Sequence, residues 1–172
     1  MKLFYKGYMS DLYIDKKTNT LIKKFEEKPT SINLEDCPIK EIFKREVKAL
    51  KEMDKIKQYG VKTPTIYEVD NKNLIYKQRF FNIEGFYKYM IKNQFNKYTY
   101  KILYKFGIFL AKYHLQSKRI HGDLNRKNIG FFKRAIFVYD PTYLKYLYTK
   151  SYYYDLVRFI YNFYPYNPFN TI

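Results

Sequence analysis

The sequence is short of several features, and each shortage excludes a class of protein. Cys37 is the only cysteine, so an internal disulfide framework is excluded and a reducing compartment is expected. The longest apolar run, FGIFLA at 106–111, falls far short of the roughly 20 apolar residues of a membrane-spanning helix. The N-terminal MKLFYKGYMSDLYID meets charge too early for a signal peptide. We therefore expect a soluble, cytoplasmic chain.

Acidic residues are also scarce, with 16 Asp and Glu against 33 Lys and Arg, which gives a formal net charge of +17. The lysines are scattered along the chain rather than gathered in a tail. Such a surface attracts nucleic acid, anionic lipid and phosphorylated substrates alike. AT-rich codons, which favour Lys, Asn, Ile, Tyr and Phe, explain the same composition. The charge therefore allows a peripheral contact with an anionic membrane at the inner face but does not select a partner.

Apolar residues are plentiful by comparison, at 47% of the chain with 22 Tyr and 15 Phe. Disorder over most of the 172 residues is therefore excluded. This length allows one substantial core or two small lobes.

The apolar pattern predicts strands around one helix, followed by helices around a polar loop. Strands are predicted at 4–15, at 20–25 and on both sides of the turn DNKN within 63–80. Helices are predicted at 39–60, 86–118 and 151–163, the first starting after Pro38 and stopping at Gly60. A short hairpin is predicted at 128–140. The result is an α+β layout in two lobes, residues 1–80 and 81–172.

One carboxylate of the first helix shares a face with apolar side chains. Glu46 lies three residues after Phe43 and four before Leu50, so it points towards the core. A buried carboxylate needs a cationic partner. The alternating strand LIKKF can direct either Lys23 or Lys24 inward to supply one. A glutamate at the rim, with its head in solvent, is the alternative.

A polar loop, HGDLNRKN at 121–128, carries the densest chemistry of the sequence. The hairpin that follows returns Asp140 to the side of Asn128. One carboxylate and one amide oxygen suit Mg²⁺, which takes few protein ligands besides phosphate and water. Asp123 would then be left to accept a hydroxyl proton as a general base. The alternative is that Asp123, Asn125 and Asn128 are turn formers that bond to their own backbone.

This loop resembles the catalytic loop H-x-D-x-x-x-x-N of the protein-kinase superfamily, in the HGD form of RIO-type kinases, aminoglycoside phosphotransferases and lipopolysaccharide-core sugar kinases. Other segments follow in that family's order. YKGYMSDLYI stands in place of the glycine-rich loop, TLIKKF resembles the lysine strand and FKREVKALKEM the glutamate helix. NLIYKQRF stands at the hinge and IFVYDP at the metal-binding Asp-Phe-Gly. The implied fold is two-lobed and kinase-like, with a small β-sheet N-lobe carrying one helix and a truncated, mainly helical C-lobe.

The resemblance implies ATP and Mg²⁺ as cofactors and assigns roles to individual residues. It implies catalytic roles for Asp123, Lys23 and Glu46, and magnesium contacts for Asn128 and Asp140. It places ATP contacts at Gly7, Ser10, Lys23, Lys77, Gln78 and Arg79. It also implies that His121 and Asp155 brace the catalytic loop.

The departures from the family pattern shape the expected acceptor. The glycine-rich loop keeps only Gly7, and no Ala-Pro-Glu segment follows Asp140. The short second lobe favours a hydroxyl acceptor on a lipopolysaccharide-core sugar or another envelope glycan over a protein serine or threonine. Two alternatives stay open. One is a pseudokinase that binds a nucleotide or partner without turnover, and the other is a basic nucleic-acid-binding protein.

Overall fold

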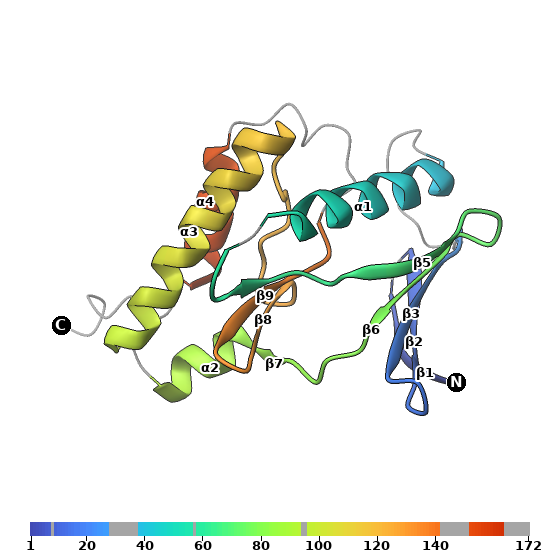
Figure 1. The fold of residues 1–172 in the computed structure, drawn as a ribbon, viewed down its shortest axis with the longest axis horizontal. Coiled ribbons are helices and arrows are strands. Elements are labelled where there is room, and N and C mark those ends of the chain that lie inside the picture. Colours follow the sequence, from blue (N-terminus) through green and yellow to red (C-terminus); the bar gives the residue numbers. More distant parts are fainter. Residues whose placement is uncertain (8, 28–37, 57, 94–95, 142–151, 164–172) are drawn as a thin grey trace.

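The computed structural model describes residues 1–7, 9–27, 38–56, 58–93, 96–141 and 152–163 of the 172-residue chain. Within these ranges the fold is a mixed α/β arrangement of two sheets and four helices (Figure 1). None of the helices in the described part is long and apolar enough to cross a membrane.

The larger sheet has five antiparallel strands in the order β1-β2-β3-β6-β5. Its strands are β1 (Lys2–Lys6), β2 (Ser10–Asp15), β3 (Thr20–Phe25), β5 (Ile66–Asp70) and β6 (Ile75–Arg79). The single strand predicted at 4–15 is wrong, because the chain turns at Gly7 and forms two strands. The Gly7 N–H donates to the Ser10 carbonyl at 3.0 Å, and a Cβ on Gly7 would lie only 2.5 Å from that oxygen. This turn therefore needs glycine.

Helix α1 (Ile39–Asp54) buries the apolar stripe that the sequence predicts, including Phe43, Leu50 and Met53. It ends six residues before the predicted stop at Gly60. The Ile56 N–H closes a tight turn onto the Met53 carbonyl at 3.0 Å. The following residues join the second sheet, where the Gly60 carbonyl accepts from the Ile136 N–H at 2.9 Å. Tertiary pairing thus ends the helix earlier than its periodicity indicates.

The smaller sheet runs in the order β4-β9-β8-β7, with β4 and β9 parallel and the other pairs antiparallel. Its strands are β4 (Val61–Lys62), β7 (Glu84–Gly85), β8 (Ile129–Phe132) and β9 (Ala135–Val138). The β8–β9 hairpin confirms the prediction at 128–140. Neither β4 nor β7 was predicted, because two residues carry no periodic signal.

The predicted helical block at 86–118 consists of two helices, α2 (Phe86–Asn93) and α3 (Lys97–Ser117). Asn96 starts the second helix, since its side chain accepts from the Thr99 N–H at 2.9 Å. Helix α4 (Tyr153–Phe163) lies beside α3, where the Phe106 and Phe159 rings are 5.2 Å apart (Figure 1).

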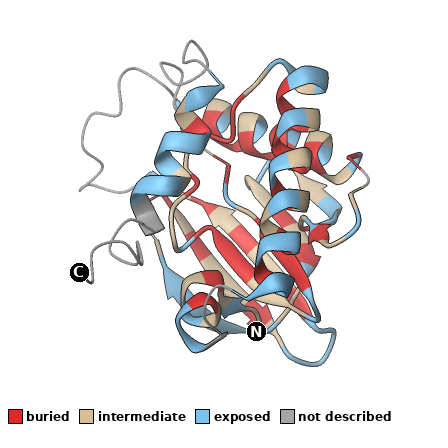
Figure 2. Cartoon of the chain, turned by 90° about the vertical axis from the view of Figure 1, so that its left-hand side faces the viewer, coloured by how far each residue is buried: buried red, intermediate tan, exposed pale blue. Residues whose placement is uncertain are grey.

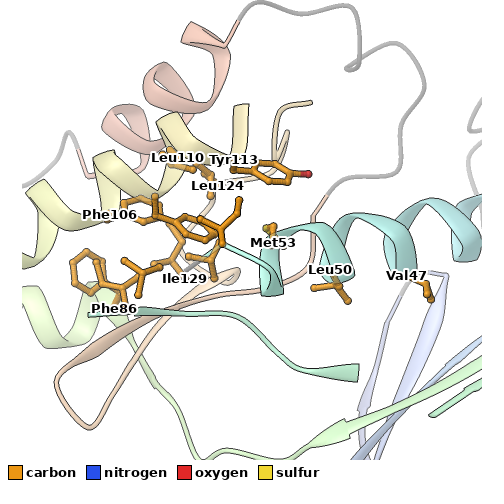
Figure 3. Packing of buried hydrophobic residues seen from close by; sticks show 14 of the residues in the cluster. Val47, Leu50, Met53, Phe86, Phe106, Leu110, Tyr113, Leu124 and Ile129 are labelled. Carbon is orange, nitrogen blue, oxygen red and sulfur yellow. The ribbon is translucent and has the colours of Figure 1, made fainter. Parts of the chain in front are cut away.

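One apolar core joins the helices to the second sheet. Figure 2 shows the buried residues on the inner sides of the helices and through the sheets between them. Figure 3 shows that this core combines Met53 of α1, Phe106 and Leu110 of α3, Leu124 of the polar loop and Ile129 of β8, which all belong to one buried cluster. Leu124 lies within the polar loop and Ile129 directly follows it. Because both are fully buried, they hold the loop at its middle and at its C-terminal end.

Candidate active site

Lys23 and Glu46 form a buried ion pair, with 2.7 Å between Nζ and Oε1. Only 8% of the lysine side chain and 1% of the glutamate side chain are exposed, so the alternative of a solvent-facing Glu46 is wrong. Lys24 points to the other face of β3 and pairs there with Glu26. The alternation of β3 thus selects Lys23 as the inward lysine.

Two further side chains, those of Tyr76 and Asp140, contact this ion pair. The sequence did not predict the contact of Tyr76. The Tyr76 hydroxyl donates to Glu46 Oε1 at 2.7 Å from β6, which lies directly beside β3 in the sheet. Lys23 also donates to the carboxylate of Asp140, 117 positions along the chain. The alternation of β6 could have indicated that Tyr76 faces inward, but not which side chain it would meet.

The charges of this cluster follow from burial and mutual attraction. Burial lowers the pKa of Lys23, but the carboxylates of Asp140 and Glu46 outweigh it and hold that pKa above its ordinary value. The two carboxylates therefore favour the charged form of Lys23. Burial raises the pKa of Glu46 to about 7, against the opposing effect of Lys23 and Tyr76.

Asp140 follows β9 with φ of +58°, in the left-handed region that aspartate tolerates better than most residues. Its side chain remains 47% exposed while it contacts Lys23. The carboxylate thus lies at the boundary between the buried lysine and solvent.

Asp123 has both carboxylate oxygens fixed by amides of its own loop. The Asn125 side chain donates to Oδ1 and the Asn128 side chain to Oδ2, each at 2.8 Å. Arg158 of α4 lies farther away, with 3.6 Å between Nη2 and Oδ1. Asn125 also accepts from the Lys127 N–H at 2.7 Å, and Asn128 donates to the Asp123 carbonyl at 3.0 Å. These are the local backbone bonds expected of turn formers, while the bonds to the carboxylate orient Asp123.

Asp155 anchors this loop to α4 from a fully buried position. Its carboxylate accepts the backbone N–H groups of His121 and Gly122, each at 2.7 Å, and contacts His114 Nε2 at 2.8 Å. Gly122 has φ of +81°, which glycine adopts without strain. His114, on the inner face of α3, is a partner that the sequence did not predict.

His121 lies inside the loop and links it to the end of β9. Its Nδ1 accepts from the Asp123 N–H at 3.3 Å, so Nε2 carries the proton and donates to the Tyr139 carbonyl at 3.1 Å. Burial lowers the pKa of His121, which keeps the ring neutral. The structure therefore places both His121 and Asp155 where they hold the loop.

A cavity of about 460 Å³ opens beside these groups. Its polar lining includes Lys23, Gln78, Asn128 and Asp140, and its apolar lining includes Leu12, Leu21 and Leu50. Gln78 and Lys23 are the predicted ATP contacts found among the described lining residues. Lys77 instead pairs with Glu68 at 2.7 Å on the other face of β6, and Gly7 and Ser10 bond to each other in their turn.

A second cavity, of about 690 Å³, lies beyond the end of α1. Its lining includes Ile56, Val61, Phe81 and Phe109, together with Arg79. Although it is larger, it contains none of the ionic groups around Lys23. The smaller cavity is therefore the candidate active site.

The residues predicted to hold magnesium fit that ion by chemistry. The Asn128 side-chain nitrogen donates to the Asp123 carbonyl at 3.0 Å and to Oδ2 at 2.8 Å, which leaves its oxygen as an acceptor. The exposed part of the Asp140 carboxylate supplies a second hard oxygen ligand. No group of three or more His, Cys, Asp or Glu side chains within the described ranges is arranged to hold a metal.

Comparison with known proteins gives a likeness of fold alone. No protein-family model matches the chain, and no curated protein matches it. Among solved structures, it is similar to PpkA-294 in its apo form, with a TM-score of 0.51 and 12% sequence identity. The match covers 81% of this chain and 56% of that one, so it spans just over half of the length of PpkA-294. The likeness is thus one of overall fold.

Proposed function

We propose that this protein is an ATP- and Mg²⁺-dependent phosphotransferase that moves the γ-phosphate of ATP to a hydroxyl group. The observation that carries the proposal is the meeting of a buried Lys23–Glu46 pair with Asp140, beside the loop of Asp123 and Asn128. These groups come from β3, α1, the end of β9 and the loop before β8. The kinase-like fold supports the same reading, with residues 1–80 and 81–172 as two lobes around the cavity.

Within this proposal each group has a distinct task. Lys23, held by Glu46, would contact the α- and β-phosphates of ATP. Asn128 and Asp140 would hold Mg²⁺, which neutralises phosphate charge during transfer. Asp123 would accept the proton of the acceptor hydroxyl. Its two amide contacts support this role, because they fix a carboxylate that is still 36% exposed to an incoming acceptor.

For the acceptor we propose a sugar hydroxyl, as in the lipopolysaccharide-core kinases that the HGD loop resembles, ahead of a protein serine or threonine. The net charge of +17 supports an approach to anionic envelope material and a peripheral contact with the membrane. Both statements rest on the sequence and on analogy of fold.

A second candidate is a nucleotide-binding pseudokinase, and two observations favour it. Gly7, the single glycine of its loop, is already used in a tight turn with Ser10. An arginine, Arg158, also lies close to the proposed base Asp123. Such a protein would bind Mg²⁺ and ATP without transferring phosphate.

Mg²⁺-dependent ATP turnover by the full chain, with and without an envelope lipid extract, tests the proposal. Turnover should be lost in Asp140→Asn and Asp123→Asn. It should persist in the control Asp70→Asn, which changes a carboxylate at the exposed β5–β6 turn. Thermal stabilisation by ATP and Mg²⁺ without turnover would favour the pseudokinase. No response to the nucleotide, together with RNA binding that survives Asp123→Asn, would favour the nucleic-acid alternative.

A further inference from the structure

The outer side of helix α3 combines apolar side chains with lysines. Positions three and four residues apart share a face of a helix. Tyr104 and Leu115 of this outer side are 72% and 64% exposed. The stripe that contains them consists of Lys97, Lys101, Tyr104, Ile108, Ala111 and Leu115, and the exposed Lys118 directly follows the helix. The stripe is therefore apolar in its middle and has lysines at both ends.

Helix α4 is rich in apolar residues that it does not bury. An amphipathic helix normally turns such side chains towards a core. In α4 the fully buried residue is Asp155, while Phe159 packs against α3. Other large apolar side chains of this helix are between 42% and 72% exposed, namely Leu156, Val157, Ile160 and Tyr161. The helix thus offers an apolar surface that a partner can cover.

The two helices are antiparallel neighbours on one side of the molecule. Phe106 contacts Phe159, with 5.2 Å between the rings, and His114 contacts Asp155 at 2.8 Å, so the contacts run in opposite order along the two helices. Figure 2 is seen from this side and shows exposed residues along the outer sides of both helices. We call this combined surface the α3–α4 face.

The charge of the α3–α4 face has a single sign. The only acidic residue of either helix is Asp155, which is buried. Lys97, Lys101 and Lys118 are exposed. Beyond Glu84 the chain has only three acidic residues, and the other two belong to the candidate active site. The face is therefore suited to an anionic partner.

The side chains of the face distinguish between three occupants. A second copy of this chain would bring an equally positive surface against it, and like charges repel. A nucleic acid would pair with the lysines and stack on the tyrosines, but Leu115, Val157 and Ile160 offer no ring on which a base can stack. An anionic bilayer fits all three kinds of side chain. Its phosphates attract lysines, tyrosine rings favour the headgroup level, and aliphatic side chains enter the acyl boundary.

We propose that the α3–α4 face binds an anionic lipid bilayer, with its aliphatic and tyrosine side chains in the headgroup region and its lysines on lipid phosphates. This assigns the peripheral membrane contact of the proposed function to a particular surface, and it does not depend on ATP turnover. Asp155 accepts the backbone N–H groups of His121 and Gly122 from the inner side of α4. A bilayer on the outer side therefore lies about one helix diameter, roughly 10 Å, from the loop that carries Asp123. An envelope glycan would then be within reach of the candidate active site.

Co-sedimentation of the full chain with vesicles tests this surface. Vesicles with roughly 30% phosphatidylglycerol in phosphatidylcholine are compared with vesicles of phosphatidylcholine alone. The expected result is binding to the anionic vesicles that is at least about tenfold tighter than binding to the neutral ones. This binding should weaken as salt rises to about 1 M, where the Debye length is about 3 Å.

Substitutions on the two helices test whether the α3–α4 face is responsible. Leu115→Glu and Ile160→Glu place a carboxylate at positions that are 64% and 62% exposed, so the fold should be kept. Each should weaken binding to the anionic vesicles roughly tenfold. The matched control Leu3→Glu changes an exposed residue of β1, at the edge of the five-stranded sheet, and should bind as the wild type does.

Charge is tested by a second matched pair. Lys101→Gln should weaken binding about fivefold, the contribution of one lysine near an anionic surface. Lys16→Gln removes the same charge from the exposed turn between β2 and β3 and should have little effect.

Several outcomes would overturn the inference. One is equal binding by wild type, Leu115→Glu and Ile160→Glu, and another is equal binding to neutral and anionic vesicles. Binding to single-stranded RNA in place of vesicles, lost in both variants, would assign the face to nucleic acid. A dimer in sedimentation velocity that both variants abolish would assign it to a second copy.

ATP turnover is a separate readout. Turnover by a chain that does not bind vesicles overturns only the membrane surface. Vesicle binding without turnover supports the surface and overturns the proposed phosphotransferase.

Discussion

Replacing Glu46 by leucine removes a carboxylate that is 1% exposed and leaves two partners without it. Lys23 loses its 2.7 Å contact and the Tyr76 hydroxyl loses its acceptor at 2.7 Å. Breaking a buried ion pair costs about 3–5 kcal/mol, and an orphaned hydroxyl about 1–3 kcal/mol. Asp140 still contacts Lys23, and leucine adds apolar contacts, so part of this cost is recovered. We expect a net loss of about 3 kcal/mol in the free energy of unfolding.

Urea denaturation of four chains measures this loss as a double-mutant cycle: wild type, Glu46→Leu, Lys23→Met, and the double variant. The double variant should be more stable than Glu46→Leu alone, because it also removes the buried lysine that has lost one of its two carboxylate partners. Both should lack ATP turnover, since neither holds a phosphate-binding lysine in place. The reasoning would be refuted if Glu46→Leu cost less than about 1 kcal/mol, or if the double variant were no more stable than Glu46→Leu.

Three further predictions follow from the loop and the turn. Asp155→Asn should weaken the hydrogen bonds that the His121 and Gly122 N–H groups donate, so hydrogen exchange at these two amides should accelerate and turnover should fall. Unchanged exchange would contradict the anchoring role of Asp155. Gly7→Ala should lower stability by about 1–3 kcal/mol in thermal unfolding, because its Cβ would lie 2.5 Å from the Ser10 carbonyl oxygen; an unchanged Tm would show that the turn can open. Burial lowers the pKa of His121 below 6.5, so as pH falls below 6.5 the unfolded chain takes up this proton before the folded chain does. The difference in free energy of unfolding between wild type and His121→Asn should therefore become smaller as the pH falls. The same pH dependence in both proteins would contradict this.

The local part of the site was predictable because it depends on short-range sequence. The loop HGDLNRKN keeps its polar residues within eight positions, and its geometry follows from Asn125 and Asn128 bonding back to Asp123. The inward direction of Glu46 followed from the spacing of apolar residues in α1. Both depend on helix period and turn chemistry, which are properties of neighbouring residues.

Arg158 and Tyr76 could not be assigned to the site in the same way. Each belongs to an element whose own period was recognised. The partner of Arg158 lies 35 positions away in the sequence, and the partner of Tyr76 lies 30 positions away. The period of a helix or strand indicates on which of its faces a side chain lies. The period does not indicate which other element packs against that face.

The sequence by itself determined the strongly periodic elements, namely α1, α3 and the β5–β6 and β8–β9 hairpins, and it determined the composition of the polar loop. Tertiary structure alone decided that Lys23 rather than Lys24 meets Glu46, that Asp140 reaches Lys23, and that β4 ends α1 early by pairing with β9. The physical reason is that alternation fixes two faces of a strand but not which face is buried. That choice is made only when the sheet, the helix and the returning hairpin pack together and a buried charge must find its partner.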